Sequence, residues 1–138
     1  EIRDFVVVDS SGRHTNTIEK GSEFEIKMRL HFNESIQQPI AAFTIKNIQG
    51  TEITGTNTMY EGINIEHPDA GRECVVTFRQ KMDLQGGEYL ISFGCTGYRN
   101  GDFTVFHRLY DACNVTVVSA KNTVGFFDMN SVVSVEEK

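Results

Sequence analysis

The chain has 138 residues, of which 39% are hydrophobic and 23% are charged, and 13 basic against 19 acidic side chains give a net charge of −6. This length suits one domain with a sizeable core, and the composition excludes a disordered chain. A membrane-spanning helix is excluded as well, because no apolar run approaches the ~20 residues that it needs. The acidic balance disfavours nucleic acids and anionic lipid surfaces as partners. We therefore expect a single domain over residues 1–138 and no nucleic-acid partner.

From the N-terminus onward, apolar and polar residues alternate with a period of two, which is typical of strands with one buried face. The segments with this pattern are Phe24–Asn33, Ala42–Lys46, Glu73–Met82, Tyr89–Cys95 and Cys113–Val117, and we expect the apolar run Phe5–Val8 to form the first strand. Helical periodicity is almost absent. The only helix candidates are a turn near Glu34–Gln38 and one within Glu61–Ala70, where Pro68 limits any extension.

Turn-forming residues separate these segments about every ten residues. The strongest turn signal is Asn100-Gly101, because a type I′ turn needs a positive φ at both of its central residues. That turn would place Arg99 opposite Asp102 and Tyr98 opposite Phe103. We predict an all-β fold in which roughly seven to nine strands form an antiparallel β-sandwich.

Residues 119–138 form a separate tail. Lys121-Asn122-Thr123 interrupts the alternation, and the segments Val124–Phe127 and Val132–Val135 resume it. A terminal strand of this kind can complete its own sheet or pair with a neighbouring subunit, and both alternatives stay open. At the other end, the chain opens at Glu1 with neither Met nor a signal peptide, so we expect a piece of a longer protein.

Motifs for catalysis are missing from the sequence. There is no GxxxxGK[ST] or GxGxxG loop, so we expect no nucleotide hydrolysis by this chain. The four histidines lack the spacing of a metal site, and we expect no metal ion and no cofactor. Cys74, Cys95 and Cys113 form no CxxC pair, which predicts reduced, buried thiols and a cytoplasmic location. We expect a domain that is not an enzyme.

Aromatic and basic residues gather around the Asn100-Gly101 hairpin, where rings could cover apolar sugar faces and polar groups could bind hydroxyls or an anionic substituent. The candidates in this set are Tyr98, Arg99, Asn100, His107, Arg108 and Tyr110. A second candidate surface is the polar face of neighbouring strands, with Arg29, His31, Thr44 and Lys46. Alternation puts Tyr98 and Arg99 on opposite faces, so the first set cannot all belong to one site. The alternative is that these rings plug the end of the sandwich and the arginines are solvated.

The segment Ile45–Thr58, which reads IKNIQGTEITGTNT, predicts a hairpin with Asn47 and Gly50 at its turn. Gly55 marks a bulge or a close backbone approach. This segment resembles the strand-turn-strand signature of the C-terminal domain of Wzt-type ABC transporter ATPases. Three further segments are similar to other parts of that domain. They are Lys20–Ile26, Leu84–Ser92 and Arg108–Val117, with Val115 where the family usually has Phe.

The resemblance extends from about Asp4 to Val118, and it implies a cytoplasmic, immunoglobulin-like carbohydrate-binding module of an ATPase at the inner face of the cell membrane. Such modules recognise a lipid-linked O-antigen-type polysaccharide, in many cases at its non-reducing end. They thereby couple glycan completion to export through the membrane subunit of the transporter. The family dimerises, with C-terminal strand exchange in some members, which would give the 119–138 tail a role in a homodimer.

Three alternatives to glycan recognition stay open. The main one is a dimerisation or assembly module of the transporter that does not contact the glycan. The others are an extracellular adhesion-type sandwich and an enzyme that acts on the glycan.

Overall fold

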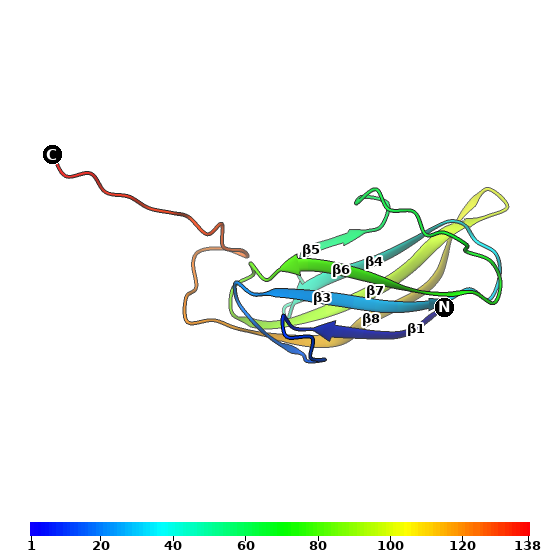
Figure 1. Ribbon diagram of the computed structural model, residues 1–138, viewed down its shortest axis with the longest axis horizontal. Helices are drawn as coiled ribbons and strands as arrows, with labels where there is room; N and C mark the ends of the chain where they lie inside the picture. The colour runs from blue at the N-terminus through cyan, green and yellow to red at the C-terminus, as the bar shows by residue number, and fades with distance from the viewer.

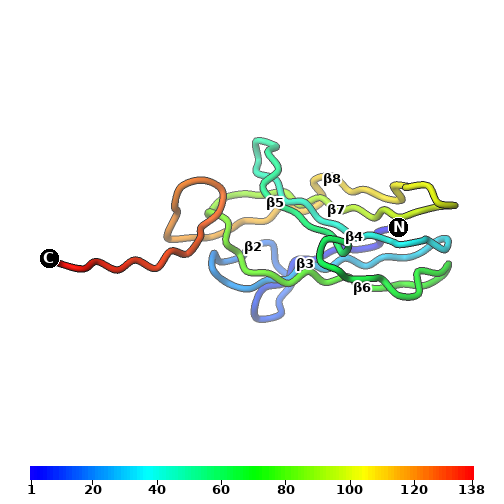
Figure 2. Tube along the Cα trace, turned by 90° about the horizontal axis from the view of Figure 1, so that it is seen from above, coloured from blue at the N-terminus to red at the C-terminus, as the bar shows by residue number.

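Eight strands form two sheets that face each other, and the computed structural model describes all of residues 1–138 (Figure 1). In chain order the strands are β1 Ile2–Val8, β2 Thr17–Glu19, β3 Glu23–His31, β4 Gln37–Asn47, β5 Glu52–Asn57, β6 Glu73–Lys81, β7 Gly87–Arg99 and β8 Asp102–Val118. The first sheet has the strand order β1-β3-β6, and the second has the order β2-β8-β7-β4-β5. Figure 2 shows the two sheets as layers, with β4, β7 and β8 in one layer and β3 and β6 in the other.

The N-terminal segment contributes to both sheets. Strand β1 pairs antiparallel with β3, whereas β2 pairs parallel with β8. All other pairings are antiparallel. This arrangement is the immunoglobulin-like β-sandwich that the sequence predicts. No helix in the structure is long and apolar enough to cross a membrane.

The core lies between the sheets and is built from the alternating residues of the strands. In β3 the inward side chains Phe24, Ile26, Met28 and Leu30 are buried, while the residues between them face solvent in whole or in part. Two aromatic contacts bind the sheets together. The rings of Phe5 and Phe93 stack with centroids 4.8 Å apart, and those of Phe43 and Phe78 meet edge to face at 4.9 Å. This cross-sheet packing holds the outer faces in a fixed geometry.

The β7–β8 hairpin turns at the predicted position. Asn100 and Gly101 have φ values of 53° and 82°, and the register pairs Arg99 with Asp102 and Tyr98 with Phe103. The predicted short strand Cys113–Val117 is wrong in extent, because it is only the end of the 17-residue strand β8. Two bulges in the β7–β8 ladder shift the phase of the alternation, and this hides the rest of the strand from the sequence pattern.

Neither helix candidate forms a helix. Strand β4 already begins at Gln37, and the residue before Pro39 adopts a positive φ of 48°. In the second candidate, Glu61–Ala70, the residue before Pro68 also has a positive φ. A residue that precedes proline is disfavoured in the right-handed helical region, so both segments run as loops or extended chain.

The C-terminal tail forms no strand of its own. Within Val124–Phe127 only Phe127 pairs, through an isolated bridge to Leu84, and Val132–Val135 pairs with nothing in the isolated chain. Figure 1 shows the last residues extending away from the sandwich. The tail is therefore a protruding arm that leaves the domain after its anchor at residues 127–130.

The two strand glycines Gly55 and Gly94 provide a matched test of packing in the second sheet. A Cβ at Gly55 would lie 2.6 Å from the backbone oxygen of Phe43, which confirms the predicted close approach, whereas a Cβ at Gly94 would meet nothing within 4 Å. We expect Gly55→Ala to lower the free energy of unfolding by about 1–3 kcal/mol through overpacking. Gly94→Ala should change it by less than about 0.5 kcal/mol. Urea unfolding of both variants checks this, and equal losses would contradict it.

Candidate functional site

The outer face of the second sheet, which is the side turned away from the first sheet, brings together five of the ten predicted site residues. Strand pairing places cross-strand partners on the same face, and the inward residues of β4 and β7 are buried in the core. The residues between them therefore point outward. The predicted residues on this face are Thr44, Lys46, Tyr98, Arg108 and Tyr110.

Small residues form the floor of this face. Gly94 lies opposite Ala42 on one side and opposite Arg108 on the other. The space above Gly94 is open, because a Cβ there would meet no atom within 4 Å. A flat ligand can therefore approach the backbone of the central strands closely, between the side chains that project at the two ends of the face.

The hairpin end of the face is aromatic. The rings of Tyr98 and Phe103 contact each other edge to face, with centroids 5.8 Å apart. Phe103 is 58% exposed, which is unusual for so large an apolar side chain. Beside Tyr98 lies a hollow of about 450 Å³, whose lining includes Pro39, Ile40 and Ile63. This end thus offers both a ring surface and an adjoining recess.

The rest of the face carries cationic groups in two different states. The Arg108 guanidinium forms no salt bridge, and its only hydrogen bond is a long one to the Tyr110 hydroxyl at 3.5 Å. Lys46, in contrast, is paired with Asp111 at 2.7 Å. Asp111 is held by the bulge in β8, where it has a φ of 50° and donates its backbone N–H to the Ser92 hydroxyl. Arg108 is therefore the cation on this face that is available to a ligand.

Three predicted hairpin residues serve the fold instead. The Nε of Arg99 donates to Glu34 at 2.9 Å, and its guanidinium lies over the Phe106 ring, so Arg99 closes the end of the sandwich. His107 accepts a hydrogen bond from the backbone N–H of Ile2 at 2.8 Å. Asn100 occupies the turn.

The second predicted surface does not exist as one face. Arg29 and His31 lie on β3 in the first sheet, where both contact Glu73. Thr44 and Lys46 lie on β4 in the second sheet, on the far side of the core. The prediction that these four residues share a surface is wrong, because strands that are adjacent in sequence here belong to different sheets.

Sequence reasoning left important members of the outer face out of the site. The Asn100-Gly101 turn already placed Phe103 opposite Tyr98, so its presence on the face could have been inferred. Asp111 carried no such signal, since its position depends on a bulge. The role of Gly94 also depends on its place in a central strand, which the sequence does not show.

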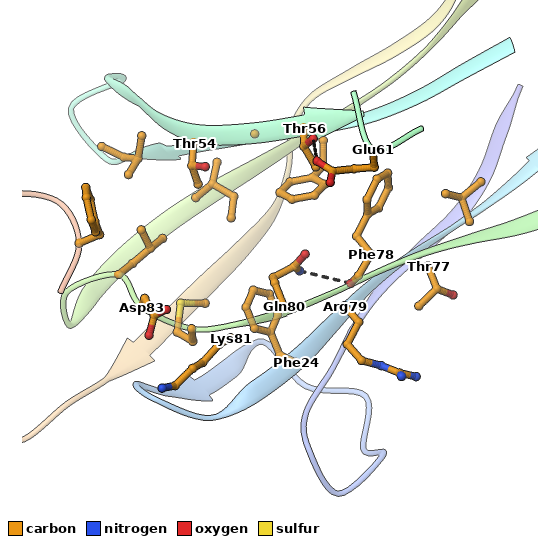
Figure 3. A pocket seen from close by; sticks show the side chains of 18 of the residues that line it. Phe24, Thr54, Thr56, Glu61, Thr77, Phe78, Arg79, Gln80, Lys81 and Asp83 are labelled. Atoms are coloured by element: carbon orange, nitrogen blue, oxygen red, sulfur yellow. Dashed lines mark hydrogen bonds between the residues drawn. The ribbon is translucent and has the colours of Figure 1, made fainter. Parts of the chain in front are cut away.

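A second concavity lies between the edge strands β5 and β6, which the sequence did not indicate (Figure 3). It is a groove of about 650 Å³ with an apolar floor that includes Phe24, Phe43 and Phe78. Threonines from β5 and polar residues from β6 form its sides, and Phe127 of the tail is also part of its lining. The groove exists because the two edge strands belong to different sheets and nothing bridges them.

Comparison with known proteins identifies the family. The family model of the Wzt C-terminal domain matches residues 1–129. The chain belongs to the Wzt C-terminal domain family. A crystal structure of the C-terminal domain of Wzt matches with a TM-score of 0.87 and 22% identity, over 99% of this chain and 83% of that chain. Curated proteins give no significant match.

Two other solved structures are less similar to the chain. The CARDB domain of the PF1109 protein from Pyrococcus furiosus has a TM-score of 0.44 and 15% identity, over 86% of this chain and 90% of that chain. A β-glucosidase from Listeria innocua has a TM-score of 0.45 and 13% identity, over 83% of this chain and 16% of that chain.

Membership of the Wzt C-terminal domain family confirms the resemblance that Ile45–Thr58 carried. It makes the chain a non-catalytic, polysaccharide-related module of an ABC transporter. No group of three or more His, Cys, Asp or Glu side chains in the structure could hold a metal ion.

The thiols of this Wzt-family domain give a test of its interior. All three cysteines are unpaired, and burial raises the pKa of the Cys74, Cys95 and Cys113 thiols above the ordinary value. At pH 8 the reactive thiolate fraction should therefore be smaller than in the unfolded chain. We expect native thiols to react with iodoacetamide at least ~10-fold more slowly than thiols in guanidinium chloride. Mass spectrometry resolves the three sites, and any cysteine labelled equally fast in both states would contradict the prediction.

Proposed function

We propose that the outer face of the second sheet binds a bacterial O-antigen-type polysaccharide without changing it chemically. The glycan would still be lipid-linked, and binding would couple its completion to export by the ABC transporter, at the cytoplasmic face of the membrane and next to the membrane subunit. One observation carries the proposal. A rigid, open floor at Gly94 lies directly beside Arg108, which forms no salt bridge, and the Tyr98–Phe103 ring pair lies further along the same face.

Each part of the face suits one feature of a sugar. The exposed ring of Phe103 and the half-buried ring of Tyr98 match the apolar C–H faces of pyranoses. Arg108 presents a guanidinium that binds hydroxyls or an anionic substituent through charge-assisted hydrogen bonds. The Lys46–Asp111 pair offers donors and acceptors that a ring hydroxyl can share. The floor of small side chains lets the sugar lie close to all three groups.

The recess beside Tyr98 favours recognition of a chain end. It lies where the loop between β5 and β6 rises next to the outer face, and it has an apolar lining with polar members such as Gln38 and Asn64. From a sugar unit placed there, the rest of the glycan would run along the open floor. We assign this recess to the non-reducing end of the polysaccharide.

A second candidate function is dimerisation of the transporter module through the C-terminal arm, Ser131–Lys138. Val132, Val133 and Val135 are 98%, 80% and 79% exposed. Apolar side chains that stay in water contribute no burial free energy to the monomer. The β6 edge next to the apolar groove is also unpaired. Fully extended, the eight residues of the arm span about 26 Å, which covers most of a nine-residue strand. The arm of one protomer would add a strand to β6 of the other and cover its groove.

The glycan proposal is tested by Arg108→Ala, with Arg99→Ala as the matched control. We expect Arg108→Ala to weaken binding of the native polysaccharide by about tenfold or more, because charge-assisted hydrogen bonds are lost. Arg99→Ala removes an arginine of the neighbouring strand β7 that lies over the Phe106 ring and not on the outer face, so it should leave the affinity within about twofold. Calorimetric titration with the native and an unrelated polysaccharide measures both.

A steric variant makes the same test independent of charge. Gly94→Leu fills the open floor while leaving the core untouched, so it should abolish glycan binding with an unchanged melting temperature. Unaltered affinity in both Arg108→Ala and Gly94→Leu would exclude this face as the glycan site.

Truncation after Asn130 separates the two candidate functions. We expect the 1–130 chain to be monomeric in sedimentation equilibrium, since the strand that pairs the protomers is gone. Its affinity for a short, monovalent oligosaccharide should be unchanged, while its apparent affinity for the polymer should fall by roughly 10²-fold through lost avidity. Loss of oligosaccharide binding together with the dimer would contradict an outer-face site contained in one protomer.

A further inference from the structure

The root of the C-terminal arm lies next to the groove of its own domain, yet the arm points away from it. Phe127 belongs to the lining of the groove and pairs with Leu84. After Asn130 every residue of Ser131–Lys138 is exposed, and Figure 1 shows the end of the chain extending away from the sandwich. Something in residues 128–130 therefore sets the direction of the arm.

Asp128 is the buried centre of this root. Its carboxylate is only 4% exposed, and its Oδ2 lies 3.0 Å from the Lys20 ammonium and 3.1 Å from that of Lys121. The backbone N–H of Asp128 donates to the carbonyl of Asp83 at 2.7 Å. Lys20 is itself fixed, since it donates to the Gln85 side chain and to the carbonyl of Lys121. The ion cluster thus joins the tail to the β2–β3 and β6–β7 connections.

Asn130 then fixes the exit of the chain. Its backbone N–H donates to the Asp128 carboxylate at 2.8 Å, and its side-chain amide donates to the Asp83 carboxylate at 3.0 Å. It has a positive φ of 55°, a conformation that asparagine tolerates better than most residues. Both groups hold Asn130 in place, and the chain that follows it leads away from the sandwich (Figure 1).

We infer that the Asp128–Asn130 clamp keeps the arm out of its own groove, so that only a second copy of the chain can receive it. The inference rests on the proposed dimer. It adds the reason why the arm binds the groove of a second protomer and not the groove of its own. Folding the arm back would require breaking the Asn130 bonds to Asp83 and Asp128. It would also disturb a buried carboxylate that holds two ammonium groups, and the loss of one partner from such a group is costly.

The clamp keeps its charge over a wide pH range. The backbone N–H of Asn130, followed by Lys20 and Lys121, holds the pKa of Asp128 well below its ordinary value. A carboxylate with a lowered pKa gives its full stabilisation above the unfolded-state pKa of about 4, and loses it only as the pH falls towards the folded-state value. The direction of the arm should therefore not change between neutral and mildly acidic pH.

Without the clamp, the groove of the same chain competes for the arm. A tethered segment has an effective concentration in the millimolar range, which exceeds ordinary protomer concentrations. Asn130→Ala and Lys121→Ala each weaken the clamp, and both residues are exposed enough for the variants to fold. Asn16→Ala is the matched control, because Asn16 is an exposed asparagine outside both proposed sites and its side chain forms no hydrogen bond in the structure.

The experiment combines sedimentation equilibrium with amide hydrogen exchange on the 1–138 chain. In the wild type, residues 131–135 should be protected only at concentrations where the dimer forms. In Asn130→Ala and Lys121→Ala we expect these residues to be protected in the dilute monomer as well, and the dimer Kd to rise by about tenfold or more. Asn16→Ala should behave like the wild type.

Two outcomes overturn the clamp inference while leaving the dimer intact. One is an unchanged Kd with an unprotected arm in the dilute clamp variants. The other is a raised Kd without protection of the arm in the monomer, since the arm would not have entered its own groove. A wild-type chain that stays monomeric with an unprotected arm at all concentrations would instead overturn the exchange itself, and the clamp inference with it.

Discussion

The antiparallel ladder between β7 and β8 runs from the Gly87–Val117 pair to the Arg99–Asp102 pair, and most other features depend on its register. Its inward residues, such as Ile91 and Phe93, join the core that binds the two sheets. Its outward residues form the larger part of the face that we assign to glycan. Two bulges along β8 add residues without breaking the hairpin, and the larger one puts Asp111 within reach of Lys46. A single ladder therefore fixes the core, the outer face and the start of the tail.

The inner side of this sheet stabilises the fold and the outer side is free for recognition, and this difference follows from the free energy of burial. Apolar inward side chains leave water and stabilise the sandwich, so that side has little freedom to vary. The outward side contributes little to stability and can combine glycine, rings and a cation without cost to the fold. A recognition site on strands also stays rigid, which matters for a weakly bound ligand because no loop must be ordered on binding. The outer face of this domain has those properties around Gly94.

An open sandwich has edges, and this domain handles its edges in different ways. Strand β8 pairs with β2 over only three residues, so most of its outer edge is free. The bulges in β8 make this edge irregular, which discourages pairing with other chains. At the opposite side, β5 and β6 leave an apolar groove, and the same chain carries an unpaired apolar arm. The buried Asp128 cluster lies between the two and holds the arm outward. An exposed apolar arm and an unpaired strand edge can cause aggregation, but in this domain both are held in a defined geometry.

The sequence by itself determined the all-β class, most of the buried residues, the Asn100-Gly101 turn and the family, because period-two alternation, turn chemistry and the Ile45–Thr58 segment are local. The sequence also placed Tyr98 and Arg99 on opposite faces of their strand, because alternation alone decides the face of each side chain. It could not show that Arg29 and Thr44 lie on different sheets, nor that His107 and Arg99 serve the fold. Those facts depend on which strands pair and on where bulges shift the phase. The groove and the Asp128 cluster were likewise decided only by tertiary structure, because each joins segments that are far apart in the chain and meet only when the sheets pack.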